Sequence, residues 1–230
     1  MNDTYIVAAT GAWNRAIFDD TISTFPGRWL FAALPADLSL DRIAPLAPRY
    51  VFFLHWSWKV PEWLWSAYEC VGFHMTDLPY GRGGTPLQNL ILRGHATTKL
   101  TAFRLANEMD AGPVYAKADL SLDGGAEQIY ERASRLATGL IREIVTRDID
   151  PVPQHGEVVT FTRRTPVDSR LPERATVEQL YDFIRMLDAD GYPHAFLECG
   201  ALRIEFRRAA QDQSGVTAEA RITITGKDQP

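Results

Sequence analysis

The sequence has two cysteines, no long apolar run and no excess of positive charge. Cys70 and Cys199 lie far apart among apolar neighbours, which favours reduced, buried thiols over a disulfide framework or a structural zinc site. No run of 18 or more apolar residues occurs, and residues 1–20 lack the basic head and apolar stretch of a signal peptide. We therefore expect a cytoplasmic protein without a membrane span and without a metal.

The charge balance also limits the possible partners. The chain has 24 basic and 29 acidic residues, and its net charge is −5. Proteins that bind long nucleic acids gain most of their affinity by neutralising phosphates, which needs the opposite sign. No nucleic-acid partner is therefore expected. The chain has 230 residues, 46% of them hydrophobic, which is enough for one good core and a small appendage.

The first 75 residues alternate short apolar runs with segments of helical spacing. The apolar runs predict strands buried on both faces at residues 5–9, 29–34, 50–54 and 70–74. The segments between them predict helices at residues 14–25, 40–46 and 61–68. This order predicts an α/β fold with a Rossmann-like, mostly parallel sheet, whose functional groups lie beyond the carboxyl ends of the strands.

The rest of the sequence, after residue 75, predicts further helices and strands of the first domain and a small second subdomain. The expected elements are helices at 86–93, 126–146 and 177–187, and strands at 98–105, 112–120, 202–208 and 218–225. A stretch rich in proline and polar residues interrupts the pattern after residue 150. We therefore predict an N-terminal domain over 1–150, a linker over 151–175 and a small α+β subdomain over 176–230.

The segment from Gly72 to Pro86 has the clearest chemical potential. His74 comes at the end of a predicted buried strand and is followed by a glycine-rich loop that leads into a helix. A histidine at that edge of an α/β sheet is well placed for acid–base chemistry, although it also suits a purely structural role. The loop lacks the residue order of a P-loop, so it either forms an unusual site or an ordinary turn.

Asp110 is the second candidate, in a tight turn just before an apolar strand. Aspartate is common in such turns because its side chain bonds its own backbone. An aspartate that instead faces a histidine fixes the tautomer of the ring, favours its protonated form and relays protons through water. Both roles stay open on the sequence alone.

Three motifs together resemble the folate-dependent formyltransferases. That family carries Asn-x-His-x-Ser-Leu-Leu-Pro, then an Arg-Gly loop with a proline, then Leu-Asp-x-Gly. The matching segments here are residues 72–79, 82–86 and 109–112, without a gap. Residues 163–168 and 179–185 resemble the linker and first C-terminal helix of the methionyl-tRNA and sugar branches. The resemblance implies a formyltransferase catalytic domain in which His74 and Asp110 are catalytic.

One position departs from the family pattern. The catalytic asparagine expected two residues before the histidine is Gly72, which has no side chain to stabilise an oxyanion. Asn89, Lys59 or a backbone N–H could replace the missing donor, and Asn89 is the first candidate. The other hypotheses are a slow or hydrolytic enzyme, or a protein that only binds folate.

The resemblance also implies the ligands. 10-Formyltetrahydrofolate would donate the formyl group, and Asp110 together with the segment Trp56, Ser57, Trp58 and Lys59 would bind it. The two tryptophans fit a core position equally well. Tyr80 and Arg82 are expected on the acceptor side, because a guanidinium suits a diphosphate, although Arg82 could instead brace the loop.

The acidic charge and small C-terminal part favour a nucleotide-linked amino sugar as acceptor over tRNA. The loop from Phe73 and the stretch 188–196 resemble the sugar N-formyltransferases and the formylation domain of gramicidin-type synthetases. The alternatives are an aminoacyl group, bound to a carrier protein or as Met-tRNA, and a folate-binding protein without turnover. The sequence does not indicate an oligomeric state.

Overall fold

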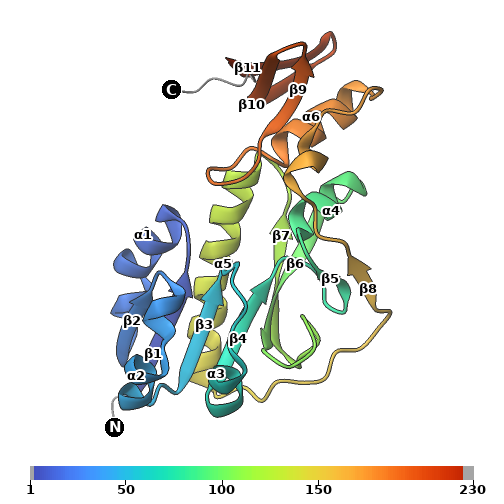
Figure 1. The fold of residues 1–230 in the computed structure, drawn as a ribbon. Coiled ribbons are helices and arrows are strands. Elements are labelled where there is room, and N and C mark those ends of the chain that lie inside the picture. Colours follow the sequence, from blue (N-terminus) through green and yellow to red (C-terminus); the bar gives the residue numbers. More distant parts are fainter. Residues whose placement is uncertain (1–2, 225–230) are drawn as a thin grey trace. The chain divides into compact units, whose positions relative to one another are not determined.

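The computed structural model describes residues 3–224, and its main element is a six-stranded sheet (Figure 1). The strand order is β2-β1-β3-β4-β6-β7, with bounds β1 Thr4–Ala9, β2 Arg28–Ala32, β3 Tyr50–Leu54, β4 Glu69–His74, β6 Thr97–Arg104 and β7 Val114–Ser121. The pairs β1–β2, β1–β3 and β3–β4 are parallel, whereas β4–β6 is antiparallel. The predicted α/β class with a largely parallel sheet is confirmed.

The chain order places a topological switch point in this sheet. β1 lies between β2 and β3, so the connections leave it in opposite directions. Ligands of open α/β sheets bind beyond the carboxyl ends of strands at such a point. We therefore expect the functional site beyond the carboxyl ends of β1, β3 and β4.

The helices and short elements follow the sequence with shifted ends. Their bounds are α1 Ala12–Asp20, α2 Leu40–Ile43, α3 Glu62–Ala67, α4 Pro86–Leu92, α5 Ala126–Arg147 and α6 Val177–Arg185, with 3-10 turns η1 Ile22–Thr24, η2 Pro35–Leu38, η3 Ala44–Leu46 and η4 Pro166–Ser169. The predicted helix 14–25 is in fact α1 and η1, because the backbone leaves helical geometry at Thr21. Short strands β5 Tyr80–Gly83 and β8 Val159–Phe161, which form a two-stranded sheet, were not predicted.

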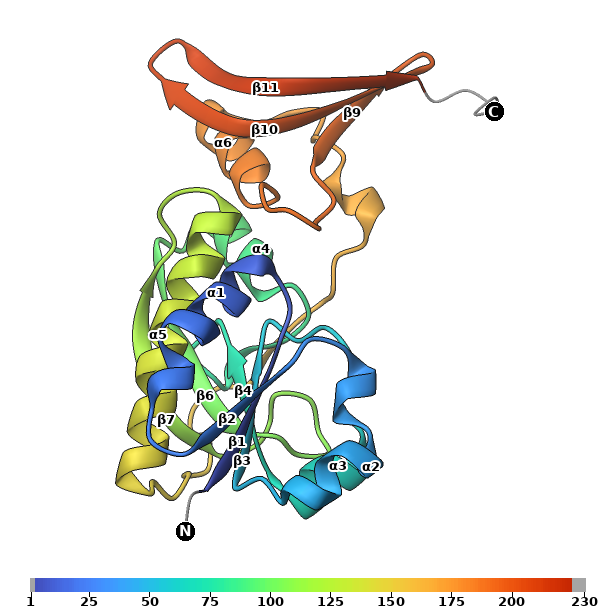
Figure 2. The same ribbon diagram turned by 90° about the vertical axis from the view of Figure 1, so that its left-hand side faces the viewer.

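The C-terminal part contains α6 and a three-stranded antiparallel sheet, ordered β11-β10-β9 (Figure 2). The strands are β9 Ala195–Cys199, β10 Leu202–Asp212 and β11 Gly215–Ile224. The predicted α+β character is present, with β9 as an additional strand. The predicted last strand extended to residue 225, which lies outside the described residues.

The compact units differ from the predicted domain limits. The first unit comprises residues 1–83, 98–120 and 131–160, and the second comprises 84–97, 121–130 and 161–230. α4 belongs to the second unit because Gln88, buried in it, donates hydrogen bonds to Tyr130 Oη and to the carbonyl of Met186, both at 3.0 Å. The hydrogen bond that joins α4 to the C-terminal part links residues 98 positions apart, so the sequence pattern did not predict it.

The described residues give three results on cysteines, metals and membranes. Cys70 and Cys199 are both free, but Cys199 is exposed, so the expectation that both are buried is wrong for Cys199. Burial raises the pKa of the Cys70 thiol far above its usual range. Within residues 3–224, no helix is long and apolar enough to cross a membrane, and no group of three metal-ligating side chains gathers.

Candidate active site

His74 is the last residue of β4, and its ring lies between two oxygen atoms. The residue is 8% exposed. Its Nε2 lies 2.8 Å from the carbonyl oxygen of Gly81, and its Nδ1 lies 3.7 Å from Oδ2 of Asp110. A carbonyl oxygen only accepts hydrogen bonds, so Nε2 carries the proton in this contact. Nδ1 is therefore the ring atom at which a proton can be exchanged, next to a carboxylate.

The loop after β4 is shaped to bring the Gly81 carbonyl back to the ring. The hydroxyl of Thr101 donates a 2.6 Å hydrogen bond to the carbonyl of Thr76, and the N–H of Tyr80 donates to the carbonyl of Asp77 at 3.0 Å. Gly81 has a φ of 76°, a backbone region that favours glycine. The glycine in this loop thus fixes the position of a histidine partner.

Asp110 is held in an unusual backbone conformation that directs its carboxylate toward β5. Its φ is 53°, in the left-handed region that aspartate tolerates better than most residues. Oδ2 accepts a 2.9 Å hydrogen bond from the N–H of Gly83. Two residues later, a Cβ on Gly112 would lie 1.7 Å from the carbonyl oxygen of Arg104, so only glycine fits. The Asp-x-Gly motif therefore combines a directed carboxylate with a close backbone crossing.

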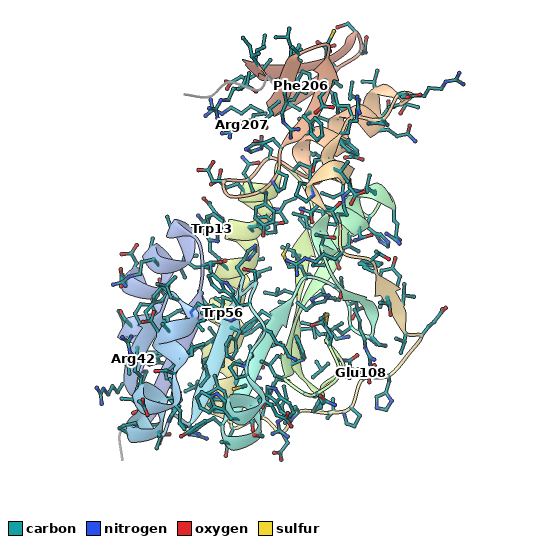
Figure 3. The ribbon with its side chains drawn as sticks, in the orientation of Figure 1. Trp13, Arg42, Trp56, Glu108, Phe206 and Arg207 are labelled. Carbon is teal, nitrogen blue, oxygen red and sulfur yellow. The ribbon has the colours of Figure 1, made fainter. Side chains whose placement is uncertain are left out.

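Arg82 and Gln154 brace the turn that carries Asp110. Oε1 of Gln154 accepts from Nε and Nη2 of Arg82 at 3.1 and 2.9 Å, while its Nε2 donates to the carbonyls of Asp110 and Gly112, both at 2.8 Å. Nη1 of Arg82 donates to Glu108 at 3.2 Å, and Glu108 lies on the loop between β6 and β7 (Figure 3). These bonds favour the bracing role over the acceptor-binding role for Arg82.

Sequence reasoning missed Gln154 because the surrounding stretch, with its two prolines, indicated a linker. The only signal there was one amide side chain among prolines. The backbone next to it is ordered by Val152, which exchanges hydrogen bonds of 2.7 and 2.8 Å with Val114. An extended segment that pairs with β7 has no helical or alternating pattern of its own, so its role depends on the tertiary structure.

The space beside Gly72 is filled by apolar side chains. Gly72 pairs with Phe103 in the β4–β6 ladder. A Cβ at position 72 would lie 2.9 Å from the Phe103 ring and from Cδ2 of Leu105. An asparagine there would meet these groups, so the missing amide is accompanied by packing that occupies its place.

Asn89 lies in the second unit, on α4, and its side-chain amide is fully engaged. Nδ2 is within 3.2 Å of the carbonyls of Gly84, Thr85 and Thr162 and of the Thr85 hydroxyl, and Oδ1 accepts from Nη1 of Arg93 at 2.9 Å. An amide has only two donor hydrogens, so these acceptors account for both. An oxyanion donor at Asn89 would have to give up such a bond, so these contacts do not support Asn89 in that role.

The segment after β3 begins with the half-buried His55 and continues to an exposed tryptophan. His55 has a φ of 53°, its carbonyl accepts a 2.6 Å bond from Thr10 Oγ1, and its ring meets the edge of Trp13 at 5.8 Å between centroids. Burial lowers the pKa of His55 to about 4. Trp56 (Figure 3) packs against the core of the first unit. Trp58 is 41% exposed, and its ring centroid lies 4.8 Å from that of Trp56.

The other predicted ligand-binding residues have less definite surroundings. Ser57 and Lys59 are exposed beside Trp58, and Tyr80 is half-buried at the start of β5. The structure thus brings together His74, Asp110 and Arg82 within the first unit. The tryptophan segment belongs to the same unit and follows β3, the parallel neighbour of β4.

Comparison with known proteins adds three findings. The model of the family described as "Methionyl-tRNA formyltransferase, C-terminal domain" matches residues 166–223. Methionyl-tRNA formyltransferase of Lactobacillus delbrueckii subsp. bulgaricus is 30% identical over 166 residues, which are 68% of this chain and 52% of that protein. The solved structure of methionyl-tRNA formyltransferase from Clostridium thermocellum is 37% identical, with a TM-score of 0.92 over 96% of this chain and 99% of that chain.

A more distant structure shares only the fold. A sugar N-formyltransferase from a Shewanella species is 15% identical, with a TM-score of 0.67 over 92% of this chain and 99% of that one. The chain spans about half the length of the curated relatives it matches.

Proposed function

Since this chain belongs to the methionyl-tRNA formyltransferase-like family, we propose that it transfers the formyl group of 10-formyltetrahydrofolate to a primary amine. The observation that carries the proposal is the His74 ring between the Gly81 carbonyl and the Asp110 carboxylate at the carboxyl end of β4. In acyl transfer, negative charge develops on the carbonyl oxygen, so the site needs a hydrogen-bond donor to that oxygen. It also needs a group that accepts the proton of the attacking amine.

The residues of the first unit suit the formyl donor. When bound, 10-formyltetrahydrofolate supplies the formyl carbon. Trp58, with its partly exposed ring beside Trp56, offers an apolar face for a flat pterin ring. Ser57 and Lys59 add polar groups for its edge and its carboxylates, and Asp110 would lie near the reacting end.

His74 and Asp110 divide the proton chemistry. With Nε2 bound to Gly81, the proton on Nδ1 of His74 stabilises negative charge on the oxygen of the formyl group. The Asp110 carboxylate lies 3.7 Å from that same nitrogen. Its carboxylate, through water, takes the proton lost by the attacking amine as the new C–N bond forms and returns it to the leaving nitrogen as the old bond breaks.

For the acceptor, the relatives support an aminoacyl group over the amino sugar favoured by the sequence. The relatives of 30% identity or more are named methionyl-tRNA formyltransferases, and the matched C-terminal region carries the same name. One observation keeps the amino sugar as a second candidate. Residues 161–224 contain nine arginines and ten acidic residues, so this region has no net positive charge to attract tRNA.

An acceptor panel tests the proposal. The protein is incubated with 10-formyltetrahydrofolate and, separately, Met-tRNA, an aminoacyl group on a carrier protein, and a set of nucleotide-linked amino sugars. Mass spectrometry then detects a formyl adduct on the amine. We expect turnover with one acceptor class, and turnover lower by about 10²-fold or more in His74→Ala.

Two results would contradict it. Folate that stabilises the protein in a thermal shift assay, without formyl transfer to any acceptor, would indicate a folate-binding protein. Release of formate at the same rate with and without acceptors would indicate a hydrolase.

A further inference from the structure

β11 is an exposed edge strand with its own pattern of side chains. It pairs with β10 along one edge, and within residues 3–224 no strand pairs with its other edge. Residues 217–224 are all exposed, including Ile222 at 61% and Ile224 at 77%. Figure 2 shows β11 as a long, gently curved strand at one side of the C-terminal sheet. A long edge with exposed apolar side chains is a template for pairing with another strand.

The sequence of β11 is complementary to itself in one antiparallel register. When two copies pair about Ala220, Glu219 lies opposite Arg221 of the second copy, and Arg221 lies opposite Glu219. The flanking pairs are also matched in type, with Ala218 opposite Ile222 and Thr217 opposite Thr223. Opposite charges and β-branched or apolar pairs directly across an antiparallel ladder are the stabilising combinations.

The neighbouring registers are disfavoured by the same residues. Pairing centred on Arg221 places that arginine opposite itself, and pairing centred on Glu219 does the same for the glutamate. Like charges directly opposite one another destabilise a ladder. The alternation of small or apolar residues with one acidic and one basic residue therefore favours the register centred on Ala220 over both adjacent registers.

We propose that two copies of this chain associate by antiparallel pairing of their β11 strands about Ala220, which joins the two three-stranded sheets into one six-stranded sheet. The site of association lies wholly in the second unit, away from His74 and Asp110 by sequence and by unit. The proposal is independent of the formyl-transfer function, and its test needs no substrate.

Charge reversal separates this pairing from contacts within one chain. Glu219→Arg places arginine opposite arginine, and Arg221→Glu places glutamate opposite glutamate, so each variant alone weakens self-association by about tenfold or more. Mixed together, the two variants form two Arg–Glu pairs across the interface, and association returns. Mixing the variants leaves the contacts within each chain as they are in the single variants. Arg208, which binds Glu219 in the native chain, faces an arginine in Glu219→Arg whether or not the second variant is present.

The experiment is sedimentation or light scattering across a concentration series, with native mass spectrometry of the mixture after isotope labelling of one variant. We expect a native species of twice the 25.8 kDa chain mass, monomers for each single variant, and heterodimers in the mixture. Glu173→Arg, an equal charge change at an exposed residue outside β11, should leave the dimer intact. A native monomer at all concentrations, a dimer unaffected by Glu219→Arg, or monomers in the mixture would each overturn the proposal.

Discussion

Two histidines stand at the carboxyl ends of adjacent strands, yet their surroundings differ. His74 ends β4, with a carbonyl oxygen at one ring nitrogen and a carboxylate at the other. His55 follows β3, with its ring against the indole of Trp13 and its pKa lowered to about 4 by burial. The first ring has an oxygen atom beside each of its nitrogens, whereas burial keeps the second ring neutral near pH 7.

The difference shows that position in the sheet does not assign chemistry by itself. Both histidines lie where an α/β fold places functional groups. What distinguishes them is the partner that a later part of the chain supplies, because Asp110 comes from the turn between β6 and β7 and its carboxylate lies beside the His74 ring. The following variants test whether this partner makes the distinction.

His74→Ala should have the largest effect on turnover. Loss of a group that stabilises the developing charge lowers kcat by about 10²–10⁴-fold. Circular dichroism and thermal melting should show an intact fold. The exposed His155→Ala is the matched control and should retain native turnover. A fully active His74→Ala would remove His74 from the mechanism, and His74 would then be a structural histidine like His55.

Asp110→Asn should have the next largest effect. It keeps the shape of the side chain and its capacity to accept a bond from Gly83, but it removes the negative charge beside the His74 ring. We expect kcat to fall by about 10²-fold, as for the loss of one charged group in proton transfer. Steady-state kinetics from pH 5 to 9 measure this together with a change in the pH profile. Asp119→Asn, at an exposed carboxylate of β7, is the control. Native kinetics in Asp110→Asn would mean that Asp110 only forms the turn.

Gln154→Ala should have a smaller effect, because Gln154 positions the Asp110 turn. Its loss leaves the carbonyls of Asp110 and Gly112 without their donor and Arg82 without its main acceptor. We expect kcat to fall by about tenfold, equivalent to 1.4 kcal/mol, with KM for the folate little changed.

The control is Glu108→Gln, which removes only the charge of the exposed partner of Arg82. A uniform loss of thermal stability with unchanged kcat in Gln154→Ala would assign Gln154 to structure alone. A shifted pH profile that follows that of Asp110→Asn would instead support positioning.

The sequence predicted the elements whose own residues carry the pattern. The buried strands β1, β3 and β4 are continuous apolar runs, and His74 and Asp110 stand in motifs that the family shares. The short strand β5 has no such pattern. Its four residues, two of them glycines, pair with β8 only because the chain returns after α5.

The roles of the polar side chains depended on contacts that no local pattern contains. Arg82 was expected at the acceptor, but its guanidinium is bonded to Gln154, which is 72 residues away. Asn89 was expected at the oxyanion, but its amide donates to the carbonyl of the nearby Gly84 and to that of Thr162, which is 73 residues away. Composition gives the type of a polar group, whereas its partner follows from the tertiary structure.

His55→Asn should have the smallest effect on turnover and a distinct effect on stability. Asparagine tolerates the left-handed backbone at this position, and we expect kcat within about threefold of native at pH 7.5, because His55 takes no part in the proposed proton transfer, which His74 and Asp110 carry out. The effect on stability follows from the lowered pKa. The unfolded chain takes up a proton on His55 near pH 6.5, while the folded chain resists it down to about pH 4. This contribution to stability is therefore complete above pH 6.5 and is lost as the pH falls toward 4.

The measurement is the free energy of unfolding in urea at several pH values between 4 and 7.5. For the native protein, His55 adds a slope of at most about 1.4 kcal/mol per pH unit in that interval. The curve of His55→Asn should be flatter by that amount, and the curve of the exposed His155→Asn should follow the native one. If His55→Asn leaves the slope unchanged, the His55 ring is not neutral in the folded protein, and the contrast between the two histidines fails on its structural side. If the slope flattens and turnover is preserved, the two neighbouring strand ends carry one catalytic and one structural histidine.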